Sequence, residues 1–252
     1  MALTLLQAVN RAELQLGLTA SSTVASSSVA QAQQMLAIAN GILEELMHDF
    51  EWQRCVYPYY FTTTLPVVAT CSFTSATAVV SVPGGVAGIL QGMVLLGGAG
   101  APYAEVASVT TADSTITMNY PAQETTASAS VNFVKQDYPL PTGYDRMVSD
   151  TNWDRTDHWR NLGPKTSQEW QWLQGGIIST GPRERWRIID DKIRYFSAPA
   201  SPLNIAFEYV SNLVVIASGG SAPTKAAFTA DSDTFIFKDE VLVKGLKYHW
   251  KQ

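Results

Sequence analysis

The sequence predicts a mixed α+β protein: a helical body of two N-terminal helices and a C-terminal helix, with an inserted small antiparallel β barrel or sandwich and a further β-hairpin region. Two observations carry this prediction. Apolar residues recur at three- and four-residue spacing near both ends of the 252-residue chain, as in amphipathic helices. Between Arg54 and Lys135 there is no lysine or arginine, and short runs of Val, Ile and Thr alternate with glycine- and proline-rich turns, which is typical of a small β module.

Two helices are expected before residue 51. The first spans Leu3–Leu16 and stops at Gly17, because glycine readily adopts the left-handed conformation that ends helices. The second spans Val29–Phe50, with a cap supplied by one of the serines in Ser26–Ser28. At 1.5 Å per residue it is roughly 30 Å long. A helix of this length needs partners, and the first and C-terminal helices are the candidates.

The β-rich part is expected to begin with the extended run Tyr57–Thr64 and to continue as the inserted module, residues 66–134. Strands are expected in this module at Ala78–Val82, Met93–Leu96, Val106–Val109, Thr115–Tyr120 and Ser128–Phe133. In the last two, apolar residues alternate with polar ones, the period of a half-exposed antiparallel sheet. Residues 1–65 and 135–252 then form the helical and mixed body around the module.

Helices and strands are both expected in the rest of the body. They are short helices near Asp145–Asp150 and Ser167–Gln174, a hairpin of Glu184–Ile189 and Lys192–Phe196 turned at Asp190-Asp191, a strand at Leu203–Ser211, a turn at Ser218–Pro223, and a final helix from Lys238 with Leu242, Leu246 and Trp250 on one side.

The charge content argues for an assembly subunit and against a DNA-coating protein. Charged residues make up 15% of the chain, below the roughly 25% of average soluble domains, so much of the surface is covered by small polar residues or by partners. The formal net charge of −5 gives no support to DNA coating, which needs clustered lysine and arginine. It suits a surface along which DNA passes without being bound.

No secretion signal, membrane span or cysteine-based site is expected. No basic residue precedes the apolar stretch Ala2–Val9, and no apolar run approaches the length of a membrane span. Cys55 and Cys71 are sixteen positions apart without a CxxC motif, which predicts two buried thiols rather than a zinc site or a disulfide. We therefore expect a chain that is made and folded in the cytoplasm and does not contact a membrane.

Two groups of residues could carry chemistry, but the sequence favours a structural interpretation of both. Glu45 and His48 have the Glu-x-x-His spacing of carboxylate-bridged metal sites, yet the second copy that such sites require is missing. An acidic cluster with a histidine, Asp150, Asp154, Asp157 and His158, has Arg146, Arg155 and Arg160 nearby as ion-pair partners. We expect no catalytic residue, metal or cofactor, and therefore not an enzyme.

Tryptophan and arginine are unusually dense between residues 145 and 188, where five of the seven tryptophans fall. Such a block forms a core with cation–π contacts, a protein interface, or a surface for nucleic acid or glycan. Alternating aspartates argue against nucleic acid. The interface candidates are Trp153, Arg155, Trp159, Trp170 and Trp172, joined by Leu242, Leu246 and Trp250 of the final helix.

Several short motifs resemble structural proteins of tailed bacteriophages. They are Leu140-Pro141, Tyr144-Asp145-Arg146, Trp153-Asp154-Arg155, Leu162-Gly163-Pro164, Glu169-Trp170 and Gly181-Pro182-Arg183. The inserted module is similar to small β modules of phage virion proteins, through Gly88-Ile89, Gly92-Met93-Val94, Gly97, Pro102, Val106–Val109, Thr115–Met118 and Pro121-Ala122. The helical frame resembles the head-to-tail adaptor (tail tubular protein A-like) class. Simple adaptors are mostly helical, so the large β module departs from their pattern.

This resemblance, which covers nearly the whole chain, implies a virion structural protein of the phage neck. It implies a cyclic ring of about twelve copies under the portal protein, which extends the DNA channel and carries the tail or nozzle proteins. Two other functions remain open from the sequence. One is a different virion component, such as a tail-tube or fibre-attachment subunit, and the other is a glycan-binding or hydrolytic protein that uses the tryptophan-rich block.

Overall fold

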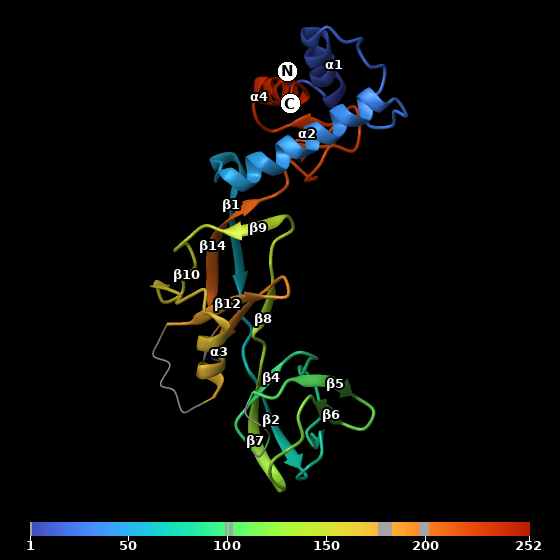
Figure 1. Cartoon of the computed structure of the whole chain (residues 1–252). Coiled ribbons are helices and arrows are strands. Elements are labelled where there is room, and N and C mark those ends of the chain that lie inside the picture. Colours follow the sequence, from blue (N-terminus) through green and yellow to red (C-terminus); the bar gives the residue numbers. More distant parts are fainter. Residues whose placement is uncertain (1, 99, 101–102, 176–182, 197–201) are drawn as a thin grey trace. The chain divides into compact units, whose positions relative to one another are not determined.

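The computed structural model describes residues 2–98, 100, 103–175, 183–196 and 202–252 (Figure 1). Within these ranges it contains four α-helices and several antiparallel sheets, which confirms the predicted mixed α+β class. The chain divides into two compact units. Unit 1 comprises Met1–Pro58, Pro141–Val148 and Glu208–Gln252, and unit 2 comprises Tyr59–Leu140 and Ser149–Phe207. The domain boundaries inferred from the sequence stay a prediction. Of the phage-like motifs, Pro102 and Gly181-Pro182 lie outside the described residues.

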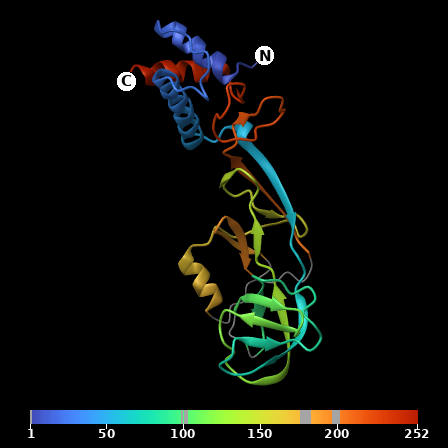
Figure 2. The ribbon, with the colours of Figure 1, turned by 90° about the vertical axis from the view of Figure 1, so that its right-hand side faces the viewer.

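Unit 1 is built on three α-helices among its described residues. Its elements are α1 (Leu5–Leu16), α2 (Ala30–Asp49), the short 3-10 helix η1 (Gln53–Cys55), β9 (Tyr144–Met147), β15 (Val215–Ile216), β16 (Thr234–Phe235) and α4 (Asp239–Trp250), with the first residues of β1 (Val56–Thr62) and the last of β14 (Asn204–Ser211). Helices α1 and α4 lie side by side in both views of the ribbon (Figure 2). Helix α4 also contacts α2, as the sequence predicts. Gly245 allows this approach, because a Cβ atom there would lie 2.8 Å from Cδ1 of Ile42.

The residue that ends α1 is the one predicted from the sequence, but the residue that caps the start of α2 is not. Thr4 and Gln7 form a capping box at the start of α1, and Gly17 ends it with a left-handed φ of 77°. The serine cap predicted for α2 is wrong. Val29 occupies the cap position without a side-chain hydrogen bond to the helix, because Ser27 Oγ accepts a hydrogen bond from the N–H of Val29 itself, at 3.1 Å.

A buried and a partly buried acid hold the loops of unit 1 on its apolar core. Glu13 is fully buried and accepts hydrogen bonds from the N–H and hydroxyl of Ser21 and from Nε2 of Gln31. Asp231 accepts the N–H groups of Val24 and Ala25 at 2.9 and 2.7 Å. The loop between α1 and α2 is therefore held by carboxylates rather than by regular secondary structure.

Asp233 organises the loop before β16 in the same way. Its buried carboxylate accepts the N–H groups of Thr229 and Ala230, both at 2.9 Å, and pairs with Nζ of Lys225 at 2.9 Å. Burial acts to raise the pKa of Asp233, but the hydrogen bonds from Lys225, Thr229 and Ala230 outweigh it and hold the pKa below its ordinary value.

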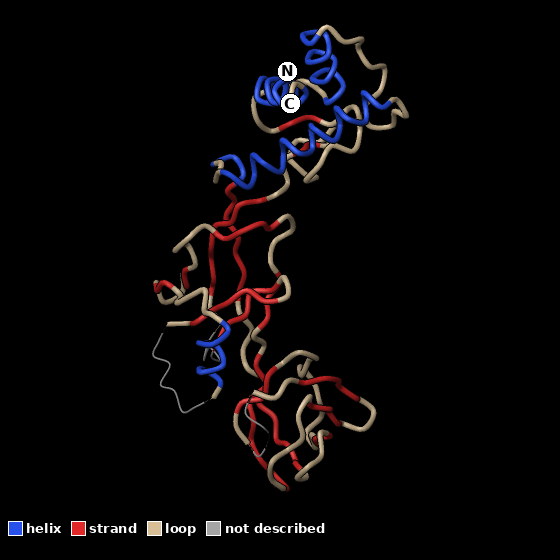
Figure 3. The backbone as a smooth tube through the Cα atoms, in the orientation of Figure 1, coloured by secondary structure: helices blue, strands red, loops and turns tan. Residues whose placement is uncertain are grey.

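The regular secondary structure of unit 2 is mainly strand; α3 (Ser167–Gln174) is the α-helix among its described residues, as Figure 3 shows. One six-stranded antiparallel sheet, here called the β module, covers residues 67–134 in the order β4-β7-β2-β3-β6-β5. Its strands are β2 (Val67–Phe73), β3 (Val79–Ser81), β4 (Val94–Leu96), β5 (Val106–Thr110), β6 (Thr115–Met118) and β7 (Thr126–Val134). The predicted strands are present, and β2 is an addition that the sequence analysis missed.

A closed barrel is not formed by the described strands of the β module. The two end strands of the order, β4 and β5, approach each other where Glu105, just before β5, forms an isolated bridge with Val94. Backbone hydrogen bonds also join Gly92 and Met93 to Val106, and Leu95 to Tyr103 and Ala104, but no continuous ladder pairs β4 with β5 among the described residues. The core of the sheet is apolar and centres on Phe73, Leu95 and Phe133. The sequence pattern identifies short antiparallel strands, but it does not fix whether the first and last of them pair continuously.

The remaining strands of unit 2 form two small sheets. They are β8 (Asp137–Pro139), β10 (Trp153–Asp154), β11 (Trp159–Arg160), β12 (Arg185–Ile189) and β13 (Lys192–Phe196), with most of β1 and the first half of β14. The predicted β12–β13 hairpin is confirmed, and its two turn residues Asp190 and Asp191 have φ values of 50° and 52°, as a type I′ turn requires. Helix α3 and strand β14 are confirmed as well.

The helix predicted near Asp145–Asp150 is wrong. Residues Tyr144–Met147 form strand β9 of unit 1, where Met147 lies opposite Tyr209 and Arg146 opposite Val210 of β14. Pairing with β14, a partner distant in the sequence, decides the conformation here against a weak local preference. No helix in the described part of the chain is both long and apolar enough to cross a membrane.

Candidate interaction surface

A two-stranded hairpin in unit 2 carries several exposed residues of the tryptophan–arginine block. In this hairpin β10 pairs with β11, so that Trp153 lies opposite Arg160 and Asp154 opposite Trp159. Strand β10 also pairs with β14, which places Trp153 opposite Ala206. Because successive side chains of a strand point to opposite faces, Trp153 and Arg160 share one face of the sheet and Asp154 and Trp159 the other.

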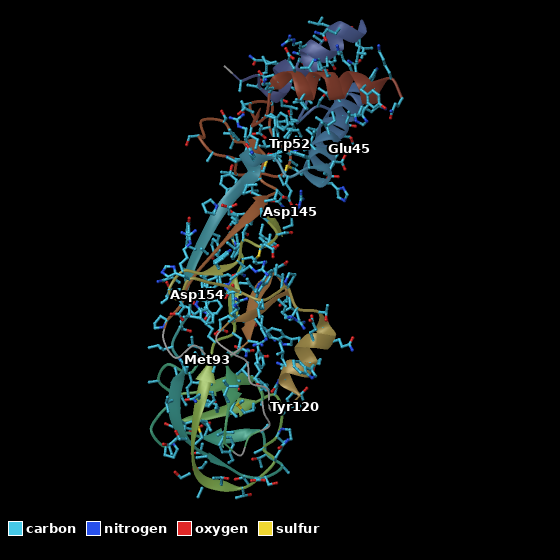
Figure 4. All side chains as sticks on the ribbon, turned by 90° about the vertical axis from the view of Figure 1, so that its left-hand side faces the viewer. Glu45, Trp52, Met93, Tyr120, Asp145 and Asp154 are labelled. Carbon is cyan, nitrogen blue, oxygen red and sulfur yellow. The ribbon has the colours of Figure 1, made fainter. Side chains whose placement is uncertain are left out.

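Polar contacts fix the hairpin from both of its ends. Asp154, which is buried and labelled in Figure 4, accepts the N–H of Thr156 at 2.8 Å and shapes the turn. Asp150 accepts a hydrogen bond from Arg160 Nη1 at 2.9 Å through its carboxylate, and one from Trp153 Nε1 at 3.2 Å through its carbonyl. The exposed tryptophan and arginine are therefore held by the same aspartate.

A buried polar network lies directly beside these two residues in the sequence. Asn152 precedes Trp153 and Asn161 follows Arg160, and Asn161 donates to Oδ1 of Asn152 at 2.7 Å. The buried hydroxyl of Tyr195 exchanges hydrogen bonds with the Asn152 side chain at 2.8 and 3.0 Å. Burial raises the pKa of Tyr195, so the phenol stays neutral and keeps its proton for this network.

The exposed face of the hairpin continues onto strand β1. The guanidinium of Arg155 lies over the ring of Tyr60, 5.3 Å from its centroid, within the range of a cation–π contact. The side chains of Tyr60 and Trp153 are 59% and 44% exposed, although both are large and apolar. We call Tyr60, Trp153, Arg155 and Arg160 the aromatic–arginine surface. Trp159, on the opposite face, is 37% exposed and has Arg183 at 6.0 Å from its ring.

The other predicted interface residues do not join this surface. Trp170 is buried against Leu173 and Phe196, and Trp172 is exposed on α3. Leu242 and Leu246 are buried in the core of unit 1, against which Trp250 packs. Tyr60 and Arg160 were missed by the sequence analysis. The aromatic run Tyr57–Phe61 was the available signal for Tyr60, and the period of β1 could have shown that it points away from the core.

The residues considered for catalysis are not gathered into a site. Glu45 pairs with His249 at 3.2 Å and His48 with its neighbour Asp49 at 3.3 Å, so these two residues of α2 do not share a ligand. Asp157 and His158 are exposed in the hairpin turn, away from the buried carboxylate of Asp154. Of the ion pairs predicted for this cluster, the one between Arg160 and Asp150 is confirmed. Among the described residues, no group of three or more His, Cys, Asp and Glu side chains is arranged to hold a metal ion.

Both cysteines are buried and free, as predicted. Burial raises the pKa of Cys55 and of Cys71 to about 11, and the neighbouring Arg54 only partly offsets this effect at Cys55. Since the thiolate is the reactive form, these thiols are poor nucleophiles and poor metal ligands at neutral pH.

Comparison with known proteins identifies no relative of this chain, so the surface is interpreted from its own residues. No protein-family model matches the chain, and no curated protein or solved structure is significantly similar to it.

Proposed function

We propose that this chain is a structural subunit of a tailed-phage virion that works by assembly and not by catalysis. In this proposal it forms an adaptor ring in the neck, between the portal protein and the tail or nozzle proteins, and extends the channel through which DNA passes. The observation that carries the assembly role is the aromatic–arginine surface, on which the large rings of Tyr60 and Trp153 are exposed beside Arg155 and Arg160.

The chemistry of this surface favours a protein partner. Tyr, Trp and Arg are the residue types that most often dominate binding energy at protein interfaces. The hairpin is held by Asp150 and by the network of Asn152, Asn161 and Tyr195, so little conformational freedom is left to lose on binding. A pre-ordered surface of this composition is the expected property of an assembly subunit.

The position in the neck rests on the sequence resemblance and on the composition. We also propose the predicted layout, in which a helical body carries an inserted β module and a hairpin region. Low charge suits a subunit with many neighbours, and the net charge of −5 suits a channel that does not retain DNA. A ring of about twelve copies needs two different complementary faces on each subunit.

Quantitative mass spectrometry of purified particles tests the proposed position. The number of copies of this chain is measured against the major capsid protein, and about twelve copies are expected for a closed neck ring. Absence of the chain from mature particles would end the virion proposal. Copies in the hundreds would instead assign the chain to the tail tube.

Two matched tyrosine variants test the surface itself. Tyr60→Ala removes an exposed ring beside Arg155, whereas Tyr120→Ala removes a ring of similar exposure from the β module. We expect Tyr60→Ala to lower incorporation into particles at least about tenfold, the effect of a residue that dominates an interface, and Tyr120→Ala to have little effect. Equal incorporation of both would argue against this surface, and loss of glycan binding specific to Tyr60→Ala would favour the glycan alternative.

A further inference from the structure

Unit 1 carries a basic groove between helices α1 and α4. Its volume is about 240 Å³, and its lining residues are Arg11, Gln15, Glu240, Val243, Lys244 and Lys247. Buried Val243 lies between cations that come from both helices. The groove thus combines an apolar contact with a positive rim.

The positive charge of this groove is only partly balanced within the chain. Lys244 is 74% exposed and lies 3.8 Å from Glu240, while Arg11 and Lys247 form no ion pair among the described residues. Two large apolar side chains on the same helices, Leu14 and Tyr248, are also exposed. Cations flanked by exposed apolar side chains match the composition of a protein interface.

A second groove of unit 1, at the C-terminal end of α2, has the opposite charge. Its volume is about 520 Å³, and its lining residues are Leu43, Glu44, Met47, His48, Asp145, Arg146, Asn212, Ala226 and Ala227. Figure 4 labels Asp145 and, on α2, Glu45. Glu44 is exposed and has no ion pair in the described part of the chain. The carbonyl end of a helix also carries partial negative charge.

The one arginine of this second groove is already engaged. Arg146 donates to the carbonyls of Met47 and Phe50 at the end of α2, at 3.0 and 3.3 Å. It also pairs with Asp145 at 2.5 Å and with Glu51 at 3.6 Å. Two carboxylates and two carbonyls therefore surround one guanidinium, and Glu44 adds a further negative charge. Exposed Phe50 supplies an apolar neighbour here too.

We infer that the basic groove of one copy of this chain docks on the acidic groove of a second copy. The two grooves share no residue, so the contact joins two different faces and is head-to-tail, as a cyclic ring requires. This inference rests on the proposed function and deepens it by naming the faces between subunits. A nucleic-acid partner for the basic groove fits less well, because Glu240 lies among its cations and the whole chain is acidic.

The molar mass of the purified full chain in solution tests the contact. Light scattering after size exclusion is expected to show association in low salt that weakens as salt is added, because exposed charges are screened. Lys244→Glu in the basic groove and Glu44→Lys in the acidic groove should each raise the dissociation constant at least about tenfold. Lys192→Glu and Glu124→Lys are the matched controls, since each reverses an exposed charge of unit 2, and they should leave the mass unchanged.

Mixing the two variants gives the sharpest result. Lys244→Glu retains its acidic groove and Glu44→Lys retains its basic groove, so an equimolar mixture of the two is expected to regain association through both the native and the reversed pair. Rescue of this kind requires direct contact between the two positions and is not produced by damage to the fold.

Three results would overturn the inference. They are a chain that stays monomeric on the order of 100 μM in low salt, variants that associate like the wild type, and a monomeric chain whose duplex-DNA binding is lost in Lys244→Glu. Mass spectrometry of particles separates this failure from that of the proposed function. About twelve copies per particle with a monomeric free chain would reject the groove contact and keep the neck assignment.

Discussion

Unit 1 and the β module of unit 2 stabilise their folds by different means. In unit 1 the buried carboxylates of Glu13 and Asp233 and the partly buried Asp231 accept backbone or side-chain hydrogen bonds from irregular loops. In the β module the charged residues are Glu105, Asp113 and Glu124, none of which is buried. Its described strands are joined by backbone ladders around an apolar core.

Unit 1 and the β module are therefore sensitive to different kinds of substitution. A loop held by a carboxylate depends on one side chain and on its ionisation, because a single acceptor serves several donors. A ladder of backbone hydrogen bonds depends on no single side chain, so its weak points are the large residues of the core. We therefore expect unit 1 to respond to pH and to polar substitutions, and the β module to respond to cavities.

The largest effect is expected for Phe133→Ala in the β module. Phe133 is fully buried, and removal of its ring leaves a cavity that should lower the free energy of unfolding by about 4 kcal/mol. All seven tryptophans lie outside residues 67–134, so tryptophan fluorescence does not report directly on this module. Denaturant unfolding followed by far-UV circular dichroism should shift, while the fluorescence transition should shift less. Equal shifts of both signals would show that the two regions unfold together.

The second largest effect is expected for Asp233→Asn in unit 1, which should lower the free energy of unfolding by about 2 kcal/mol at neutral pH. The substitution removes the negative charge that pairs with Lys225 and accepts hydrogen bonds from two loop N–H groups. The pKa of Asp233 is lowered in the folded chain. Its stabilisation is therefore complete above the ordinary aspartate pKa of about 4 and is lost as the pH falls through the folded value.

Thermal unfolding between pH 3 and pH 7 tests both parts of this prediction. The wild-type chain should lose stability on the acid side, and Asp233→Asn should lose less of it there. Asp113→Asn in the β module, where Asp113 is exposed, is the control and should leave the profile unchanged. Parallel profiles for all three proteins would remove Asp233 as the source of acid sensitivity.

Arg146→Gln should lower the free energy of unfolding by a smaller amount, about 1 kcal/mol. The guanidinium lies at the C-terminal end of α2 and donates to two of its terminal carbonyls, where a cation is favourable. Amide hydrogen exchange should show faster opening of the last turn of α2, with less change at α1. Unchanged protection at residues 46–49 would contradict the role of Arg146 as a helix cap.

The smallest effect is expected for Val68→Thr on the exposed face of β2. Val68 is 66% exposed, and both residue types favour strands, so the free energy of unfolding should change by less than about 0.5 kcal/mol. Denaturant unfolding by circular dichroism measures it directly beside Phe133→Ala. A change above 1 kcal/mol would mean that this face is covered within the folded chain.

Long periodic segments were predictable from the sequence, and pairings between distant segments were not. Helices α1, α2 and α4 follow from their apolar stripes, and the β12–β13 hairpin from its Asp190-Asp191 turn. Strand β9 was mistaken for a helix because its conformation depends on β14. Strand β2 was missed although its burial alternates along Val67–Phe73, because Ala69 and Cys71 are small and Val68 places an apolar residue on the exposed face.

The sequence predicted the residue types of the candidate surface, but not which of these residues are exposed. The density of tryptophan and arginine indicates the region, yet Trp170 belongs to a core cluster while Trp153 is exposed. The difference depends on which face of a short strand or helix each ring occupies, and a two-residue strand such as β10 has no period to read. Tyr60 joins from β1 through a contact with Arg155 that spans ninety-five positions of the sequence, so the period of β1 can indicate an exposed ring but not its partner.

The way the chain divides between the two units has a consequence for its synthesis. Helices α1 and α2 leave the ribosome first, whereas α4, which packs against both, is translated after the whole of unit 2. The faces of α1 and α2 that contact α4 in the folded chain therefore stay exposed to solvent until the ribosome has synthesised unit 2 and α4. Nascent chains stalled before Lys238 should show protected amides in the β module and rapid exchange in α1 and α2. Protection of α1 and α2 in these stalled chains would mean that other residues cover their apolar faces before α4 is made, so that both helices fold without α4.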